Sequence, residues 1–210
     1  MRRSFILLAF LAAGCGQLPA ERSIRIDLPA PPAAHPLADA GLTLRLLRFT
    51  ASGDPLQQRN LAYVEADAPT DIRQAATIVW EEPPEVESSA YLGAALTGAG
   101  ASVIANGIPG MPNYVLSGIV QRFELMGGAT GTAVVSLDIA VSDAKTGAAW
   151  LTTSYCASAV TADRSLPAVQ RAFQAAMAEI AGHLVADMAA RHGGGAIAPP
   201  VPHGSRLASC

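Results

Sequence analysis

Basic and aromatic side chains are scarce in this sequence. Of its 210 residues, 15% are charged and 5% are aromatic, the only lysine is Lys145, and the formal net charge is −3. A protein that follows a nucleic-acid backbone needs a stripe of Lys and Arg, usually with aromatic side chains among them. The sequence has no such stripe. We therefore expect no nucleic acid among the partners of this protein.

Histidine is also scarce, which limits the catalytic sites that the chain can build. His35, His192 and His203 lie in segments rich in proline and glycine, so a Ser-His-Asp arrangement would depend on His183. That residue stands among apolar neighbours of a predicted helix, where a partly exposed position is more common than a general base. The glycine-rich run 93–110 lacks the Gly-Lys-Ser/Thr ending of a phosphate-binding loop. We expect a protein that is not an enzyme and needs no cofactor.

The pattern of acidic residues and cysteines predicts no metal site. Four glutamates between positions 81 and 87 stand at the start of a predicted helix, where they complement the helix dipole, and the loop spacing of a calcium site is missing. The three cysteines match no zinc or redox spacing. Cys156 and Cys210 are candidates for a disulfide in an oxidising compartment. Because Cys210 ends a glycine- and proline-rich segment, two free thiols are the alternative.

No apolar run reaches the roughly 18 residues that a membrane-spanning helix needs. The apolar stretch 5–13 follows Arg2 and Arg3 and leads through small residues to Cys15. This order is typical of a secretory signal peptide, here residues 1–14. Its end resembles a bacterial lipobox, in which the cysteine is lipidated and becomes the first residue of the mature chain. An ordinary signal peptide with an incidental cysteine is the alternative.

Lipidation of Cys15 would tie the mature chain to a membrane. Several acyl chains on one residue, palmitate among them, hold a protein on a bilayer where one chain does so only reversibly. The rest of the chain would face the periplasm of the cell envelope. Gly16 stands where an aspartate commonly signals retention in the inner membrane, so we expect the outer membrane.

The mature chain divides into three parts by composition. Residues 15–41 hold many prolines around one short alternating stretch at 23–28, and they predict a lipidated tether with one strand in it. Residues 42–190 carry the regular apolar patterns and predict the folded domain. Residues 191–210 are rich in glycine and proline and predict a disordered tail.

The apolar periods within 42–190 predict strands and two helices. Single strands are expected at 42–49, 61–65, 76–80 and 102–105, and a three-stranded antiparallel meander at 113–125, 130–141 and 149–160. Helices are expected at 83–96 and 165–190, the second with Ser165 as its N-cap. A helix with one apolar face must cover another element. We therefore predict an α+β two-layer domain with two helices packed on one face of a mostly antiparallel sheet.

Three aromatic residues are candidates for contact with a partner or with lipid. Tyr63 and Trp80 fall in predicted strands, and Tyr91 falls on the first predicted helix. Aromatic side chains at interfaces combine a large apolar surface with a polar group. Packing in the core is the alternative, and it is the more frequent one for aromatics in such elements.

Five segments occur in an order that resembles a known family. They are residues 59–63 (RNLAY), 78–84 (IVWEEPP), 91–96 (YLGAAL), 114–124 (YVLSGIVQRFE) and the turn at 143–147. A tyrosine-bearing strand, a Trp-x-x-Pro-like start of a helix, a strand of this YxLxGxI type and a long C-terminal helix recur in this order in the PqiC-like ABC-type transport auxiliary lipoproteins. The chain resembles this family over about residues 42–190.

The resemblance implies a non-enzymatic lipoprotein. It would work with an ABC permease, an ATPase and an MCE-domain protein to move phospholipid or related hydrophobic molecules across the envelope. ATP hydrolysis would then belong to another subunit. An outer-membrane assembly lipoprotein that binds a β-barrel partner is the alternative. The sequence leaves the oligomeric state open, a homo-oligomer included.

Overall fold

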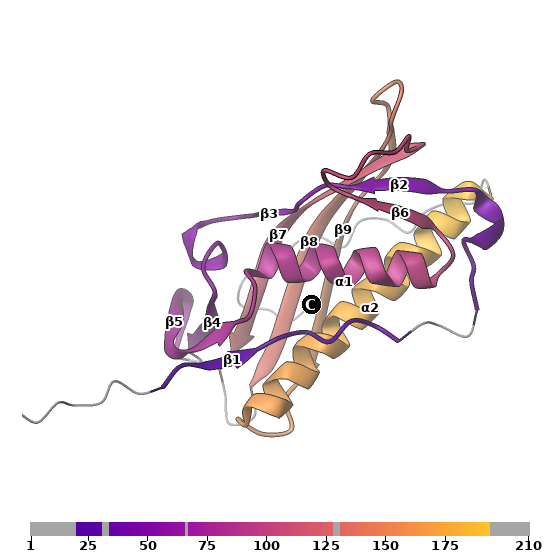
Figure 1. Cartoon of the computed structure of the whole chain (residues 1–210). Helices are drawn as coiled ribbons and strands as arrows, with labels where there is room; N and C mark the ends of the chain where they lie inside the picture. Colours follow the sequence, from indigo (N-terminus) through magenta and orange to yellow (C-terminus); the bar gives the residue numbers. More distant parts are fainter. Residues whose placement is uncertain (1–19, 31–33, 66, 128–130, 194–210) are drawn as a thin grey trace, which may run out of the picture.

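The computed structural model describes residues 20–30, 34–65, 67–127 and 131–193. Within these residues nine strands form one sheet and two α-helices cover it, so the fold is α+β as predicted (Figure 1). In chain order the elements are β1 (Arg22–Ile24), a 3-10 turn (Ala38–Ala40), β2 (Thr43–Leu46), β3 (Thr50–Ala51), a second 3-10 turn (Asp54–Leu56), β4 (Asn60–Glu65), β5 (Ala68–Trp80), α1 (Pro84–Gly98), β6 (Ser102–Ala105), β7 (Tyr114–Met126), β8 (Thr132–Asp143), β9 (Ala149–Val160) and α2 (Leu166–His192). The predicted signal peptide, Cys15 and most of the predicted tail lie outside the described residues.

Strand β7 organises the sheet. One edge of β7 pairs antiparallel with β8, and β8 pairs antiparallel with β9, as the predicted meander requires. The other edge of β7 receives β2, β3 and β4 one after another, and all three are parallel to it. Beyond them, β5 pairs antiparallel with β4, while β1 and β6 pair parallel with β5 and β2. The three longest ladders are antiparallel, but the sheet as a whole is mixed.

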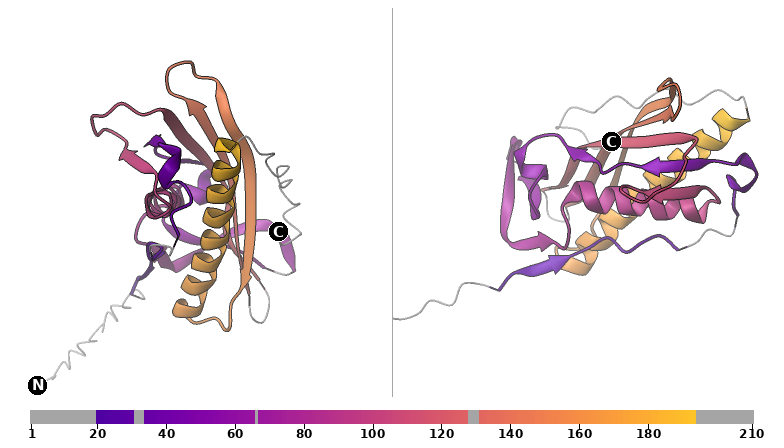
Figure 2. Two further views of the ribbon diagram at one scale, coloured as in Figure 1. Left: turned by 90° about the vertical axis from the view of Figure 1, so that its right-hand side faces the viewer. Right: turned by 45° about the horizontal axis from the view of Figure 1, so that its top comes forward.

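Both helices lie on the same side of the β7–β9 ribbon, which agrees with the predicted two layers (Figures 1 and 2). Helix α2 packs on β8 and β9, and α1 packs on β6, β7 and α2. The rings of Trp80 at the end of β5, Phe123 on β7 and Phe173 on α2 meet in the core between the layers. Their centroids lie 4.9 to 5.0 Å apart. Three distant segments of the chain are joined at this point.

Helix α2 begins where the sequence predicts. The Ser165 side chain accepts a hydrogen bond from the backbone N–H of Ala168 at 3.4 Å, and Pro167 lies in the first turn. The predicted apolar face is buried in full: Val169, Phe173, Ala176, Met177, Ile180, Leu184 and Met188. Arg191 and His192 complement the negative end of the helix dipole in the last turn. None of the described helices is long and apolar enough to cross a membrane.

The segment expected to be a tether is partly built into the domain. Strand β1 pairs with β5, and Ile24, Ile26 and Leu37 are buried in the core. The backbone N–H of Leu37 donates to the carbonyl of Ala99 at 2.9 Å. The described residues between 20 and 41 therefore belong to the packed domain, and β1 overlaps the single strand expected at 23–28. Prolines marked this stretch as irregular, but its isolated apolar side chains fill gaps in a core formed by later segments.

Strand β5 is much longer than the predicted strand at 76–80. Its first half is polar, so it carries no apolar alternation that would reveal a strand. That half pairs with β4, and the carboxylate of Glu65 accepts a hydrogen bond from the guanidinium of Arg73 across the two strands at 2.9 Å. Cross-strand pairs of this kind stabilise a hairpin in water.

Candidate functional site

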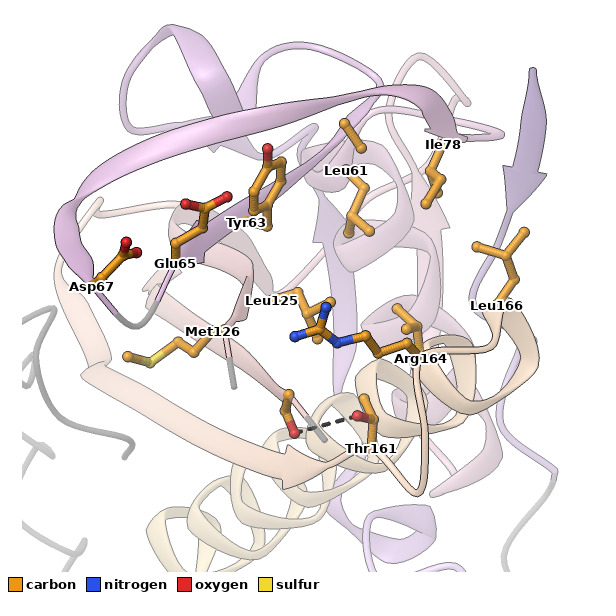
Figure 3. Close-up of a pocket in the computed structure, with 14 residues that line it drawn as sticks. Leu61, Tyr63, Glu65, Asp67, Ile78, Leu125, Met126, Thr161, Arg164 and Leu166 are labelled. Carbon is orange, nitrogen blue, oxygen red and sulfur yellow. Dashed lines mark hydrogen bonds between the residues drawn. The ribbon is translucent and has the colours of Figure 1, made fainter. Parts of the chain in front are cut away.

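A cavity of about 610 Å³ lies at one end of the two-layer domain. One wall is the hairpin of β4 and β5, the floor is the end of β7, and the second wall is the connection from β9 to α2 (Figure 3). Most of its lining is apolar, and the main contributors are Leu61, Ile78, Leu125, Met126, Leu166 and Val169. Pockets of this size and character are the usual binding sites for small amphipathic ligands.

The connection from β9 to α2 is held in place by hydrogen bonds to the residue before β8 and within the connection itself. The backbone N–H and the hydroxyl of Thr161 both donate to the carbonyl of Gly131, at 3.1 and 3.3 Å. The carboxylate of Asp163 accepts from the backbone N–H of Ser165 at 2.7 Å. Hydrogen bonds from the hydroxyl and the backbone of Ser165 lower the pKa of Asp163. The connection therefore has a defined shape, and it directs Arg164 into the cavity beside Leu125 (Figure 3).

The opposite wall of the cavity is acidic at its edge. Tyr63 and Glu65 come from β4, and Asp67 follows them (Figure 3). Arg73, which binds Glu65, also binds Asp71 at 3.1 Å, and these two carboxylates raise the pKa of Arg73, with the hydrogen bond to Asp71 as the main cause. The cavity thus combines an apolar interior with one guanidinium and two carboxylates. Such an arrangement suits a molecule with a hydrocarbon part and a polar head.

A second cavity of about 640 Å³ lies over β7, β8 and β9. Its lining includes Asp138, which points away from the helices because its neighbours Leu137 and Ile139 face the core. Gln121 donates to one carboxylate oxygen of Asp138 at 2.6 Å, and Ser154 donates to the other. These two hydrogen bonds join the side chain of Asp138 on β8 to both neighbouring strands, β7 and β9.

The three aromatic candidates have different positions. Tyr63 lines the first cavity. Trp80 is fully buried between Phe123 and Phe173, and Tyr91 is 2% exposed, so burial raises its pKa. The contact role considered for Trp80 and Tyr91 is therefore corrected, because both residues belong to the core.

The cysteines are only partly described. Cys156 is half-buried on β9 and takes part in a disulfide. Cys15 and Cys210 lie outside the described residues, so the lipidation of Cys15 and the pairing of Cys156 with Cys210 stay predictions.

The acidic residues at the start of α1 have a structural place. Glu85 is buried, and one of its carboxylate oxygens lies 3.7 Å from the guanidinium of Arg48. Burial is the main cause that raises the pKa of Glu87. Within the described ranges, no three His, Cys, Asp or Glu side chains gather as ligands for a metal ion. His183 is exposed on α2, 4.0 Å from Glu179.

Sequence reasoning found Tyr63 but missed the rest of the first cavity. Its lining comes from four segments, near residues 61–67, 75–78, 125–131 and 161–169. Arg164 stands in an ordinary Asp-Arg-Ser sequence before a helix, so no local pattern distinguishes it. Only the folding of β4 beside β7 and of α2 across the sheet brings these segments together.

Residues 27–185 match the family model described as the ABC-type transport auxiliary lipoprotein component. A solved structure from Xanthomonas campestris, assigned to the family DUF330, superposes with a TM-score of 0.66 at 14% sequence identity, over 83% of this chain and 98% of that one. A second, uncharacterized protein reaches a TM-score of 0.65 at 12% identity, over 80% of this chain and 99% of its own. At these identities the likeness concerns the fold alone. No curated protein matches the sequence.

Proposed function

We propose, since this chain belongs to the ABC-type transport auxiliary lipoprotein family, that it supports the movement of phospholipid or a related hydrophobic molecule across the bacterial envelope. Members of this family are lipoproteins of the cell envelope that are associated with a transporter. The partners in this proposal are an ABC permease, its ATPase and an MCE-domain protein. The chain itself is non-catalytic in this proposal, and the ATPase supplies the energy.

The apolar cavity between the β4–β5 hairpin and α2 is the observation that supports a hydrophobic cargo. It has a volume of about 610 Å³, and leucine, isoleucine, valine and methionine side chains form most of its surface. A subunit that takes up part of a lipid during transfer needs an apolar space of this kind.

The proposed anchor is lipidated Cys15 in the outer membrane. Strand β1 begins at Arg22, seven positions after the anchor residue Cys15. Seven extended residues span at most roughly 25 Å. The domain is therefore held near the membrane surface, where a partner in the periplasm can reach it.

Affinity purification from detergent-solubilised membranes tests the proposed function. The tagged full-length chain is compared with its Cys15→Ala variant, and the proteins and lipids that copurify are identified by mass spectrometry. We expect the wild type to recover an MCE-domain protein and its permease, and Cys15→Ala to recover much less of both. Recovery of a β-barrel protein alone would favour an assembly lipoprotein and contradict the proposal, and so would recovery of no envelope partner.

A further inference from the structure

We propose that the cavity beside Arg164 holds one acyl chain of a zwitterionic phospholipid, with the phosphate at Arg164 and the ammonium group at the side of Glu65 and Asp67. This inference rests on the proposed function, and it names the lipid class and the residues of this subunit that would recognise it. It predicts that this subunit by itself contacts the transported lipid and that it prefers one kind of head group.

The apolar lining and the size of the cavity limit the hydrocarbon part of the ligand. Leu61 and Ile78 form one wall, Leu125 the floor and Leu166 the other wall (Figure 3). Val169 on α2 also lines the cavity. A cavity of about 610 Å³ lies in the range of sites for drug-sized ligands, which are smaller than a lipid with two chains. The cavity therefore accepts one chain, and the second chain would stay outside.

The charges of the cavity limit the head group. The guanidinium of Arg164 extends over Leu125 into the cavity, and its planar donors match a phosphate (Figure 3). Glu65 and Asp67 line the same cavity from the other wall, so a ligand with negative charge alone would meet two carboxylates. A head that carries a phosphate and an ammonium group matches both signs. Phosphatidylethanolamine has such a head, whereas phosphatidylglycerol lacks the ammonium group.

The two carboxylates differ in their surroundings. Glu65 is half-buried and already binds Arg73 at 2.9 Å, whereas Asp67 is exposed at the rim. Removal of the Glu65 charge would therefore also weaken the pairing of β4 with β5. Asp67 can be changed with less effect on the hairpin, which makes it the residue to test.

The position of the cavity points to the membrane as the source of the ligand. Ile78 in the cavity wall is the pairing partner of Arg22, the first residue of β1. Cys15 precedes Arg22 by only seven residues. The cavity is therefore next to the point where the folded domain continues toward its lipid anchor, and the bilayer that holds the anchor can supply the acyl chain.

Photocrosslinking in vesicles tests this inference. The lipidated full-length protein is reconstituted into vesicles of equal parts phosphatidylethanolamine and phosphatidylglycerol. The vesicles contain a trace of one lipid or the other with a diazirine in its acyl chain. We expect crosslinks at peptides that contain Leu125 or Leu166, with roughly threefold more product from the phosphatidylethanolamine probe. Absence of these crosslinks, or stronger labelling by phosphatidylglycerol, would overturn the inference.

Variants separate the apolar part of the site from its charges. Ala75→Phe fills the cavity and should abolish the crosslinks, whereas Ala140→Phe, in the second cavity, should keep them. Arg164→Gln should reduce labelling by both probes by about tenfold, and Arg171→Gln on the exposed side of α2 should not. Asp67→Asn should remove the preference between the two lipids. Equal labelling of the wild type and the Ala75→Phe variant, with both folded by circular dichroism, would contradict the proposed site.

Two further readouts distinguish the possible failures. If the wild type recovers its transporter partners in the affinity purification but shows no crosslinks, the inference fails and the proposed function stands. If it recovers no such partners, the proposed function fails as well. If crosslinks at Leu125 and Leu166 appear only after Cys15→Ala, the acyl chains of the anchor itself occupy the cavity and the inference is wrong.

Discussion

The phenolic oxygen of Tyr155 on β9 lies 2.8 Å from a carboxylate oxygen of Asp187 on α2, to which it donates a hydrogen bond. The contact joins the long helix to the outer strand of the antiparallel ribbon. Burial raises the pKa of Tyr155, and the hydrogen bond and negative charge of Asp187 raise it further. Tyr155 therefore stays protonated and remains a donor over the whole physiological range of pH.

Tyr155→Phe removes this hydrogen bond without changing the ring. Since a hydrogen bond to a charged acceptor typically contributes about 1.5–3 kcal/mol, we expect a loss of that size in the free energy of unfolding. Urea unfolding followed by circular dichroism measures the change. Tyr114→Phe is the control, because the Tyr114 ring packs on Trp150, and we expect it to cost less than about 0.5 kcal/mol. Equal losses in both variants would show that the hydrogen bond contributes nothing.

Two glycine-to-alanine substitutions should change stability in opposite directions. A Cβ at Gly118 on β7 would lie 2.5 Å from Cε2 of the buried Phe49 ring, so we expect Gly118→Ala to cost about 1–3 kcal/mol. At Gly182 on α2 a Cβ would have nothing within 4 Å, so Gly182→Ala should stabilise the protein by about 0.5–1 kcal/mol. Thermal unfolding of both variants beside the wild type measures the difference. A stabilised Gly118→Ala variant would contradict the packing of Phe49 against β7.

Acid should weaken the turn between β8 and β9. The carboxylate of Asp143 accepts hydrogen bonds from the backbone N–H and the hydroxyl of Thr146 and from the backbone N–H of Lys145, and these lower its pKa. A lowered pKa in the folded state gives a stability contribution that is present above the ordinary value of about 4 and is lost as pH falls through the folded value. We expect Asp143→Asn to show a smaller acid-induced fall in melting temperature than the wild type below about pH 4. Parallel curves for both proteins would contradict this assignment.

We expect Cys156 to be joined to Cys210 in the mature protein. Cys156 takes part in a disulfide, and lipidation would occupy the sulfur of Cys15, which leaves Cys210 as its partner in the chain. Peptide mapping without reduction should yield one linked pair from these two cysteines, and reduction should separate it. A free thiol at Cys156 in protein from an oxidising compartment would contradict the prediction. Cys210→Ala, in which that thiol should become reactive, is the matched variant.

The elements that the sequence predicted well are those whose signals are local. The apolar face of α2 and its Ser165 cap follow from residues three or four positions apart, and the β7–β8–β9 meander follows from alternation between short turns. The order of the family segments also needs no tertiary information. These features were sufficient for the α+β class, for the two helices on one side of the sheet, and for the family.

The tertiary structure decided what depends on distant segments. The parallel pairing of β2, β3 and β4 with β7 joins strands that no hairpin connects. Ile24 and Leu37 are buried only because residues later in the chain complete the core around them. The cavity beside Arg164 combines residues from 61 to 169, and each of its four segments is unremarkable alone. Helical and strand periods report which face of an element is buried, because burial repeats along the element. They do not report which elements meet, because that choice is made by packing across the whole chain.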